Sequence, residues 1–318
     1  MIGMEFVNVL MGLMFAGVAI VNARDAASPK RYVNGAFWGL WSVTFLFGSH
    51  LPNFVNGLIV LGMVAVMAIW KLGGPPPERS TRDEREASAV KWGNKLFIPA
   101  LTIPGVTVLG TLGFKYVTIG GAPLVDPKQV TLVALGLATI AALIVGMVML
   151  RPPMRAPMIE ARRLMDAVSW AAVLPQMLAA LGTMFALAGV GPIVANILQR
   201  VIPLDTTFAV VATYTIGMAI FTAIMGNAFA AFPVMTAGIG LPLIVGKFGG
   251  DVVVMAAVGM VSGFCGTLMT PMAANFNIVP AALLELPDEN AVIKVQIPTG
   301  LVLLAANTFI MYSFVFRK

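Results

Sequence analysis

One candidate site is a join without charged residues between two long apolar runs. The runs cover residues 208–225 and 229–245, and the join reads Gly226, Asn227 and Ala228. A loop in water usually carries charge, whereas uncharged backbone outside a helix is tolerated at membrane depth where it faces a cavity or buried protein. We therefore expect the join to be the substrate-binding tip of a re-entrant hairpin. Two complete spans joined by a tight turn are the alternative.

A second candidate site interrupts the apolar stretch 252–284. It contains Thr270, Pro271, Asn275 and Asn277, and it follows a glycine-rich approach. Proline removes a backbone donor and clashes with the preceding turn. An asparagine amide can bond the freed backbone groups or a ligand. The pattern predicts a discontinuous helix with these four residues at a substrate site, and a plain proline kink is the alternative.

The absence of charge at both interruptions restricts the chemistry that they can support. No acidic residue falls at the centre of an apolar run, which disfavours a proton relay built on intramembrane carboxylates. An anion would be held by half-helix N-termini and by amide and hydroxyl donors. The matching carbonyl ends could hold a small cation such as sodium.

The supply of reactive side chains argues against an enzyme. The chain has one cysteine and one histidine, so it has no internal disulfide and no Cys/His cluster for zinc, haem or an iron–sulfur centre. A catalyst within the membrane would need a nucleophile, base or metal at depth. We expect no enzymatic activity and no resident cofactor, with sodium as a coupling ion; a metal site is not predicted.

Composition identifies the elements that must position these sites. The 318 residues are 59% hydrophobic and only 11% charged, too little charge to cover a soluble protein of this size. Soluble enzymes and nucleic-acid-binding proteins are thereby excluded. About ten apolar segments approach the 20 residues that cross a bilayer. The sequence predicts an all-α polytopic membrane protein, with a hairpin and a discontinuous helix among its segments.

Charge in the loops predicts the topology and a division of the chain. Most Lys and Arg residues lie in alternate loops, which places those loops in the cytoplasm and both termini outside. We expect N-terminal membrane helices over residues 1–72 and a charged cytoplasmic linker over 73–95. Residues 96–150 are predicted to be a diverged repeat, and 151–318 a transporter-like repeat that carries the hairpin and the broken helix.

A short similarity between two stretches of the chain, here called the echo, supports the diverged repeat. The stretch 93–105 shares its order of Gly-Asn, Pro, Thr and Gly with 226–238, with one-residue shifts. Repeats let carriers build two alternative faces around one midplane site. We therefore predict a second-repeat site at Gly93, Asn94, Pro99 and Thr102, with a chance match as the alternative.

Several of these segments together resemble a known family. Residues 37–40, 93–95, 97–100, 174–182, 226–240 and 268–286 identify the chain as a member of the bacterial permease family catalogued as domain of unknown function nine-seven-nine. From residue 167 onward it is also similar, more distantly, to one repeat of the ion-transporter superfamily of divalent-anion and citrate carriers. In that superfamily the hairpin tip reads Ser-Asn-Thr. This chain has Gly226 and Ala228 in place of the Ser and the Thr, so two hydroxyls are missing and sodium coordination is in doubt.

The resemblance implies a function and partners. It implies an elevator-type carrier in the bacterial inner membrane, with substrate and sodium between the hairpin tip and the helix break. It further implies a small organic anion such as 5-oxoproline or another carboxylate as substrate. A second small membrane protein or a second copy of the chain would complete the permease. A non-transporting scaffold subunit of a two-component permease is the alternative.

Overall fold

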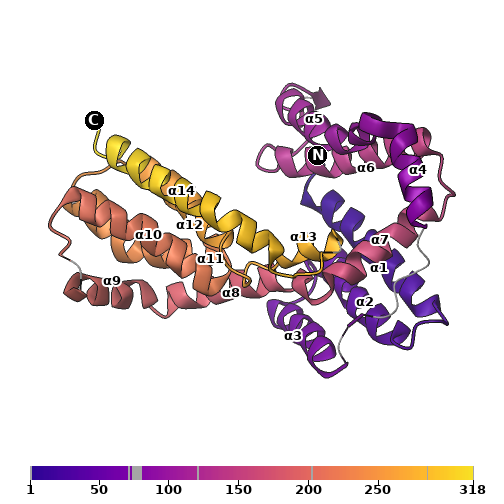
Figure 1. Ribbon diagram of the computed structural model, residues 1–318, viewed down its shortest axis with the longest axis horizontal. Helices are drawn as coiled ribbons and strands as arrows, with labels where there is room; N and C mark the ends of the chain where they lie inside the picture. Colours follow the sequence, from indigo (N-terminus) through magenta and orange to yellow (C-terminus); the bar gives the residue numbers. More distant parts are fainter. Residues whose placement is uncertain are drawn as a thin grey trace. The chain divides into compact units, whose positions relative to one another are not determined.

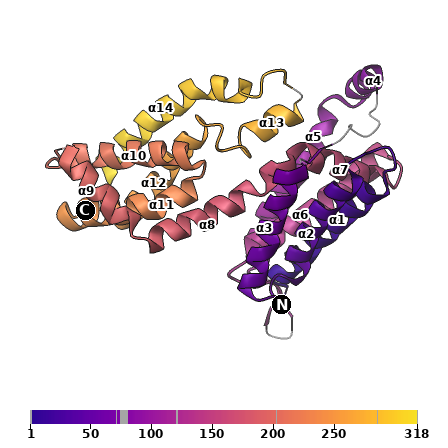
Figure 2. The ribbon, with the colours of Figure 1, turned by 90° about the horizontal axis from the view of Figure 1, so that it is seen from below.

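A computed structural model shows the chain as helical, and in the part that it describes the only strands are two short ones (Figures 1 and 2). It describes residues 2–70, 72–73, 81–119, 122–201, 203–284 and 286–317. The strands are β1 (Thr118–Ile119) and β2 (Ala122–Pro123), which form an antiparallel pair. The predicted all-α class is confirmed.

The chain divides into two units, Met1–Asp166 and Ala167–Lys318, here called unit 1 and unit 2. Unit 1 contains the predicted N-terminal helices, the linker 73–95 and the diverged repeat 96–150. Residues 74–80 of that linker lie outside the described residues. The predicted transporter-like repeat begins at residue 151, so its first residues belong to unit 1 and the remainder makes up unit 2.

Unit 1 is built around two helical hairpins, α1–α2 and α5–α6. Its helices are α1 (Met4–Arg24), α2 (Arg31–Phe47), α3 (Asn53–Trp70), α4 (Arg82–Trp92), η1 (Gly93–Leu96), α5 (Phe97–Gly113), α6 (Val130–Leu150) and α7 (Ala156–Val168). The ring of Phe15 on α1 stacks on Trp38 and Trp41 of α2, with centroids 5.6 and 5.5 Å apart. These stacked rings form the buried aromatic core of the first hairpin.

A polar cluster joins α7 to the loop after α1. The guanidinium of Arg162 donates to Asp25 at 2.7 Å and to Asp166 at 3.3 Å, and the indole of Trp38 donates to Asp166 at 2.9 Å. The hydrogen bond from Arg162 lowers the pKa of Asp25 below its ordinary value. The cluster joins two connections that the charge pattern places on one side of the membrane.

The opposite end of unit 1 brings together two further segments predicted to share a side. The backbone amide of Ile2 donates to the carbonyl of Leu124 at 2.7 Å, and the amide of Asp126 donates to the carbonyl of Ile2 at 3.0 Å. The start of the chain and the loop before α6 therefore lie at the same end. This agrees with the predicted alternation of the loops.

Unit 2 packs α10, α12 and α14 side by side, with α11 and η3 against α10 and α12 (Figure 1). Its helices are η2 (Ser169–Ala172), α8 (Leu174–Leu187), α9 (Val190–Val201), α10 (Thr207–Met225), α11 (Ala228–Met235), η3 (Thr236–Lys247), α12 (Val252–Thr267), α13 (Ile278–Leu283) and α14 (Ala291–Phe314). The core is apolar and includes Tyr214, Met218, Met235 and Met255.

Seven helices in the described residues are long and apolar enough to cross a membrane. They are Met4–Arg24, Asn53–Trp70, Asp83–Gly113, Val130–Leu150, Thr207–Met225, Ala228–Lys247 and Ala291–Phe314. Three other predicted segments correspond to the shorter helices α2, α8 and α12, of 17, 14 and 16 residues. The chain is therefore a multi-pass membrane protein.

Candidate functional site

The predicted hairpin tip is a sharp turn between α10 and α11. Gly226 ends α10 with φ of +74°, a left-handed conformation that favours glycine. Asn227 then caps α11, because its side-chain oxygen accepts a hydrogen bond from the amide of Phe229 at 2.8 Å. Ala228 is buried at the first position of α11. The helical segments on both sides of the turn, Thr207–Met225 and Ala228–Lys247, are long and apolar enough to cross a membrane. The alternative of two complete spans requires this length.

The predicted interruption after α12 is confirmed, and it is wider than a proline kink. Helix α12 ends at Thr267 and α13 begins at Ile278. The fully buried Asn277 bridges the gap, since its amide donates to the carbonyls of Thr267 at 2.8 Å and Thr270 at 2.7 Å. The side chain thus supplies donors to carbonyls that the broken helix leaves without an intrahelical partner.

The hairpin tip and the helix break meet. The hydroxyl of Thr270 donates to the carbonyl of Ala223 in the last turn of α10 at 2.7 Å. A Cβ atom added to Gly226 would lie 2.5 Å from the carbonyl oxygen of Met272, so the glycine allows this close approach. Two interruptions that the sequence identifies separately therefore form one site, here called the tip–break site.

Two buried oxygen atoms at this site lack hydrogen-bond partners within the described chain: Oδ1 of Asn277 and Oγ1 of Thr222. Both residues have an exposed fraction of 0%. Thr222 lies one turn before the tip, and its own carbonyl accepts the amide of Gly226 at 2.6 Å. An unsatisfied buried polar atom costs about 1–3 kcal/mol. Such atoms normally have a partner, so both oxygens are free to take part in a further hydrogen bond at this site.

The helix ends give the site both signs of partial charge. The carbonyl ends of α10 and α12 and the amide end of α11 all border the tip–break site. Amide ends favour anions and carbonyl ends favour cations. The polar groups identified at this site, from Thr222, Asn227, Thr270 and Asn277, are uncharged. The site can therefore bind through neutral donors and acceptors.

The remaining predicted residues of the break lie at its surface. Pro271 and Asn275 are exposed, whereas Thr270 and Asn277 are buried. Thr270 uses its hydroxyl for the carbonyl of Ala223 and also accepts the amide of Met272 at 3.2 Å. Asn277 is thus the asparagine that enters the buried part of the site, and Asn275 borders it from outside.

The four second-repeat positions lie in unit 1 and form no comparable hairpin. Gly93 ends α4 with φ of +47°, as Gly226 ends α10, but Asn94 lies inside η1. Pro99 and Thr102 follow within α5, where the hydroxyl of Thr102 donates to the carbonyl of Ile98 at 2.8 Å. The chain continues from α4 into α5 as one helical run, so here the echo does not produce a tip.

Sequence reasoning did not identify the π-helix η3, which follows α11 directly and has 12 residues. π-helical segments are rare and often lie at functional sites. The hydroxyl of Tyr214 on α10 lies 3.0 Å from that of Thr236, the first residue of η3. The hydroxyl oxygen of Tyr214 would also lie 2.5 Å from a Cβ atom added to Gly259 of α12. The glycine-rich face of α12 therefore lets α10 approach closely.

The described residues contain no group of three or more His, Cys, Asp or Glu side chains that could hold a metal ion. Any cation at the tip–break site would be bound by carbonyl, hydroxyl and amide oxygens. Oxygen ligands of this kind suit hard cations.

These features define a class: a multi-pass helical membrane protein in which a helical turn meets a discontinuous helix at an uncharged polar site. Comparison with known proteins gives the family. The chain matches the family described as "Protein of unknown function (DUF979)" over residues 5–316, and it belongs to that family. No curated protein and no solved structure matches the chain.

Proposed function

We propose that the chain is a secondary transporter, as a permease or a permease subunit, for a small organic anion. The observation that supports this most is the contact between the hairpin tip and the helix break around two unpartnered buried oxygens. An anion at this site would be bound by the amide end of α11 and by the side chains of Asn227 and Thr222, while Thr270 would hold the break against α10 through its bond to Ala223. The oxygen of Asn277 would accept a hydrogen bond from a donor group on the substrate.

The proposed mechanism is elevator-type alternating access, in which unit 2 carries the substrate site. In this proposal α10 and the segment after it form a re-entrant hairpin, in an arrangement like that of the ion-transporter superfamily. The substrate would be 5-oxoproline or another carboxylate. Sodium would be the coupling ion, and its oxygen ligands would come from helix carbonyls and Thr222 because Gly226 and Ala228 offer no hydroxyl.

The same proposal includes location and partners. The chain would act in the bacterial inner membrane as a carrier without enzymatic activity. A second small membrane protein or a second copy of the chain would complete the permease. The positions Gly93, Asn94, Pro99 and Thr102 would be the remnant of a second-repeat site.

One observation favours the alternative, a non-transporting scaffold subunit. The echo in unit 1 is helical through α4, η1 and α5, so the described residues contain one tip–break site rather than two. Carriers with paired repeats use both. In this alternative a partner would contribute the substrate site, and replacing residues of the tip would leave transport by the assembly intact.

The test is the thermal unfolding of the full chain in detergent, with 5-oxoproline and a panel of other small carboxylates. Each is measured in sodium and in potassium. A ligand that binds the folded state raises the unfolding midpoint by mass action. Asn227→Asp keeps the oxygen that caps α11 but adds a negative charge at the tip. The matched control, Asn196→Asp, makes the same change at an exposed position of α9.

We expect one carboxylate to raise the midpoint of the wild type and of Asn196→Asp, and to leave that of Asn227→Asp unchanged. A larger shift in sodium than in potassium would support sodium coupling. If no carboxylate shifts the midpoint, the claim that this chain binds substrate by itself is overturned, and the scaffold alternative is favoured. An equal shift in all three proteins would move the binding site away from the tip.

A further inference from the structure

The side-chain amide of Asn277 is held in one orientation by the helix break. Its nitrogen donates to the carbonyl of Thr267 at 2.8 Å and to the carbonyl of Thr270 at 2.7 Å, so both of its N–H groups are used. A backbone carbonyl can only accept a hydrogen bond, so turning the amide over would set its oxygen against two other acceptor oxygens. Oδ1 of Asn277 is therefore fixed at this position as an acceptor.

The neighbouring backbone supplies no donor for this oxygen. Asn277 is the N-cap of α13, a position at which an asparagine oxygen normally accepts the amide of the second or third helical residue. The side chain makes no such cap bond here. The second residue, Val279, donates its amide to the carbonyl of Ala274 at 2.8 Å, and the third, Pro280, has no N–H group. Oδ1 is buried and has no hydrogen-bond partner within the described chain.

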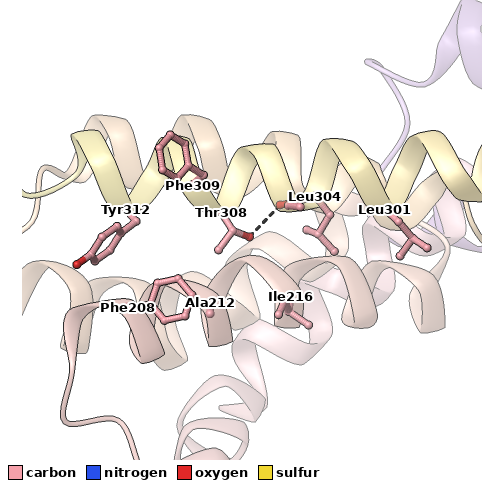
Figure 3. A pocket seen from close by; sticks show the side chains of 9 residues that line it. Phe208, Ala212, Ile216, Leu301, Leu304, Thr308, Phe309 and Tyr312 are labelled. Carbon is pink, nitrogen blue, oxygen red and sulfur yellow. Dashed lines mark hydrogen bonds between the residues drawn. The ribbon is translucent and has the colours of Figure 1, made fainter.

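Polar side chains of α14 show the more usual arrangement. The hydroxyl of Thr308 donates to the carbonyl of Leu304 at 2.8 Å (Figure 3). The amide of Asn307, which is also a buried asparagine, donates to the sulfur of Cys265 at 3.4 Å. These groups use partners within the chain, whereas Oδ1 of Asn277 can accept a hydrogen bond from a ligand.

The hairpin tip presents the opposite kind of group. The side-chain oxygen of Asn227 accepts the amide of Phe229 at 2.8 Å, which leaves its amide nitrogen, a donor, for a ligand. The tip and Asn277 are connected, because Asn277 bonds the carbonyl of Thr270 and the hydroxyl of Thr270 bonds the carbonyl of Ala223 in α10. A donor from the tip and an acceptor from the break thus belong to the same site.

The sequence around the site contains no charged side chain that could take over either role. The chain has no Asp, Glu, Lys, Arg or His between Asp205 and Lys247, or between Asp251 and Glu285. Within these stretches a carboxylate meets only neutral donors. A second carboxylate directed at Oδ1 of Asn277 would set two acceptors against each other. The site therefore suits a ligand with a carboxylate at one end and a donor at the other.

We infer that the substrate of the tip–break site is a small monocarboxylate that also carries a neutral N–H or O–H donor. In this inference, which rests on the proposed transport function, Asn227 binds the carboxylate and Asn277 accepts the donor. Asn277 has an exposed fraction of 0%, so the break must open before the donor reaches its oxygen. Asn277 would then be a specificity-determining residue, because a ligand without a donor leaves the oxygen unpaired.

The test compares carboxylates that differ in the donor alone, with the full chain in detergent and sodium. One pair is 5-oxoproline and its lactone analogue, in which a ring oxygen replaces the N–H group. The second pair is glycolate and methoxyacetate, in which a methyl ether replaces the hydroxyl. Succinate represents dicarboxylates without a donor. The Kd of each compound is obtained from the rise of the unfolding midpoint with its concentration.

Two variants assign the effect to one side chain. Asn277→Ser keeps a donor for the carbonyls of the break but removes the amide oxygen. Asn277→Gln, which keeps the amide and displaces its oxygen by one methylene group, replaces it if Asn277→Ser does not fold. Asn307→Ser is the matched control at the buried asparagine of α14.

We expect the member of a pair that carries the donor to bind the wild type and Asn307→Ser at least about tenfold more tightly than its partner, the effect of one buried hydrogen bond. In Asn277→Ser or Asn277→Gln the two members should bind alike. Succinate should bind the wild type more weakly than the monocarboxylates with a donor.

Equal Kd values within the pairs in the wild type would overturn the inference and leave the proposed function standing, because a carboxylate would still bind. Succinate that binds as tightly as the monocarboxylates with a donor would have the same consequence. If no compound binds, the proposed function and the inference both fail. A tenfold difference that persists in the Asn277 variant would overturn the role of Asn277.

Discussion

The unpartnered hydroxyl of Thr222 provides a direct test of whether the tip–break site binds a ligand. Valine has nearly the same shape as threonine, so Thr222→Val removes the hydroxyl and leaves the packing of α10 intact. Thr215 provides the matched control on the same helix. It is equally buried, but its hydroxyl donates to the carbonyl of Val211 at 3.0 Å and lies 2.8 Å from the hydroxyl of Thr308.

The two variants should differ in their effect on the free energy of unfolding. Thr215→Val loses satisfied hydrogen bonds and should lower it by about 0.5–1.5 kcal/mol. Thr222→Val removes a buried group without a partner in the chain and should leave it unchanged or raise it by up to about 1–3 kcal/mol. For a domain of this size, 1 kcal/mol moves the unfolding midpoint by about 2–4 °C. Thermal unfolding of both variants in the same detergent therefore separates them.

The stabilisation by bound ligand should be smaller in Thr222→Val than in Thr215→Val. A carboxylate at 100 times its Kd stabilises the wild type by about 2.7 kcal/mol. If Thr222 donates a hydrogen bond worth about 1.4 kcal/mol to that ligand, Thr222→Val weakens binding about tenfold and leaves about 1.4 kcal/mol of stabilisation at the same concentration. Thr215→Val should keep the full shift. A Thr222→Val protein that is as destabilised as Thr215→Val, with an unchanged ligand shift, would refute the reasoning.

Three further variants test the geometry around the two polar clusters. Gly226→Ala should lower the unfolding midpoint in detergent, because φ is +74° and the new Cβ would lie 2.5 Å from the carbonyl oxygen of Met272; an unchanged midpoint would contradict the close approach. Asn227→Ala should cost about 0.5–2 kcal/mol through the lost cap of α11, whereas Asn227→Ser should restore most of it; equal midpoints would rule out the cap. The pKa of Asp25 is held below its ordinary value of 3.8 by Arg162, so the pair stabilises the fold above that value and loses this effect as pH falls through the lowered pKa. Asp25→Asn should accordingly be less stable than the wild type at neutral pH and converge with it in acid, and a constant difference at every pH would contradict the assignment.

The two interruptions could be predicted from sequence because each rests on a local signal. Proline ends a helix through its own ring, and a glycine in a charge-free join permits a turn. Their proximity was implied only by the resemblance to the ion-transporter superfamily. The residues alone do not predict the contact, since it joins Ala223 to Thr270 across a long stretch of chain. Thr222 carried no signal either. It is one of several threonines in an apolar run, and only packing shows which hydroxyl lacks a partner.

Similar local sequences form different structures where the continuation of the chain differs. Gly93 and Gly226 both end a helix at positive φ. The following asparagine caps a new helix at Asn227, while Asn94 lies in a 3₁₀ turn that carries the chain on into α5. Sequence spacing alone cannot separate these outcomes, because tertiary packing overrides local propensity. The π-helix η3 was missed for the same reason: its one proline and three glycines indicate disruption without specifying which helix forms.

The unpartnered oxygens also bear on the choice between carrier and scaffold. In a subunit that only supports a partner, the hydroxyl of Thr222 and the amide oxygen of Asn277 would cost free energy in every folded molecule. Valine would fill the position of Thr222 without that cost. A carrier needs such groups, because its substrate must bind weakly enough to leave, and neutral hydrogen bonds bind more weakly than ion pairs. An uncharged site with unused hydrogen-bonding atoms is therefore better suited to the proposed transport than to support.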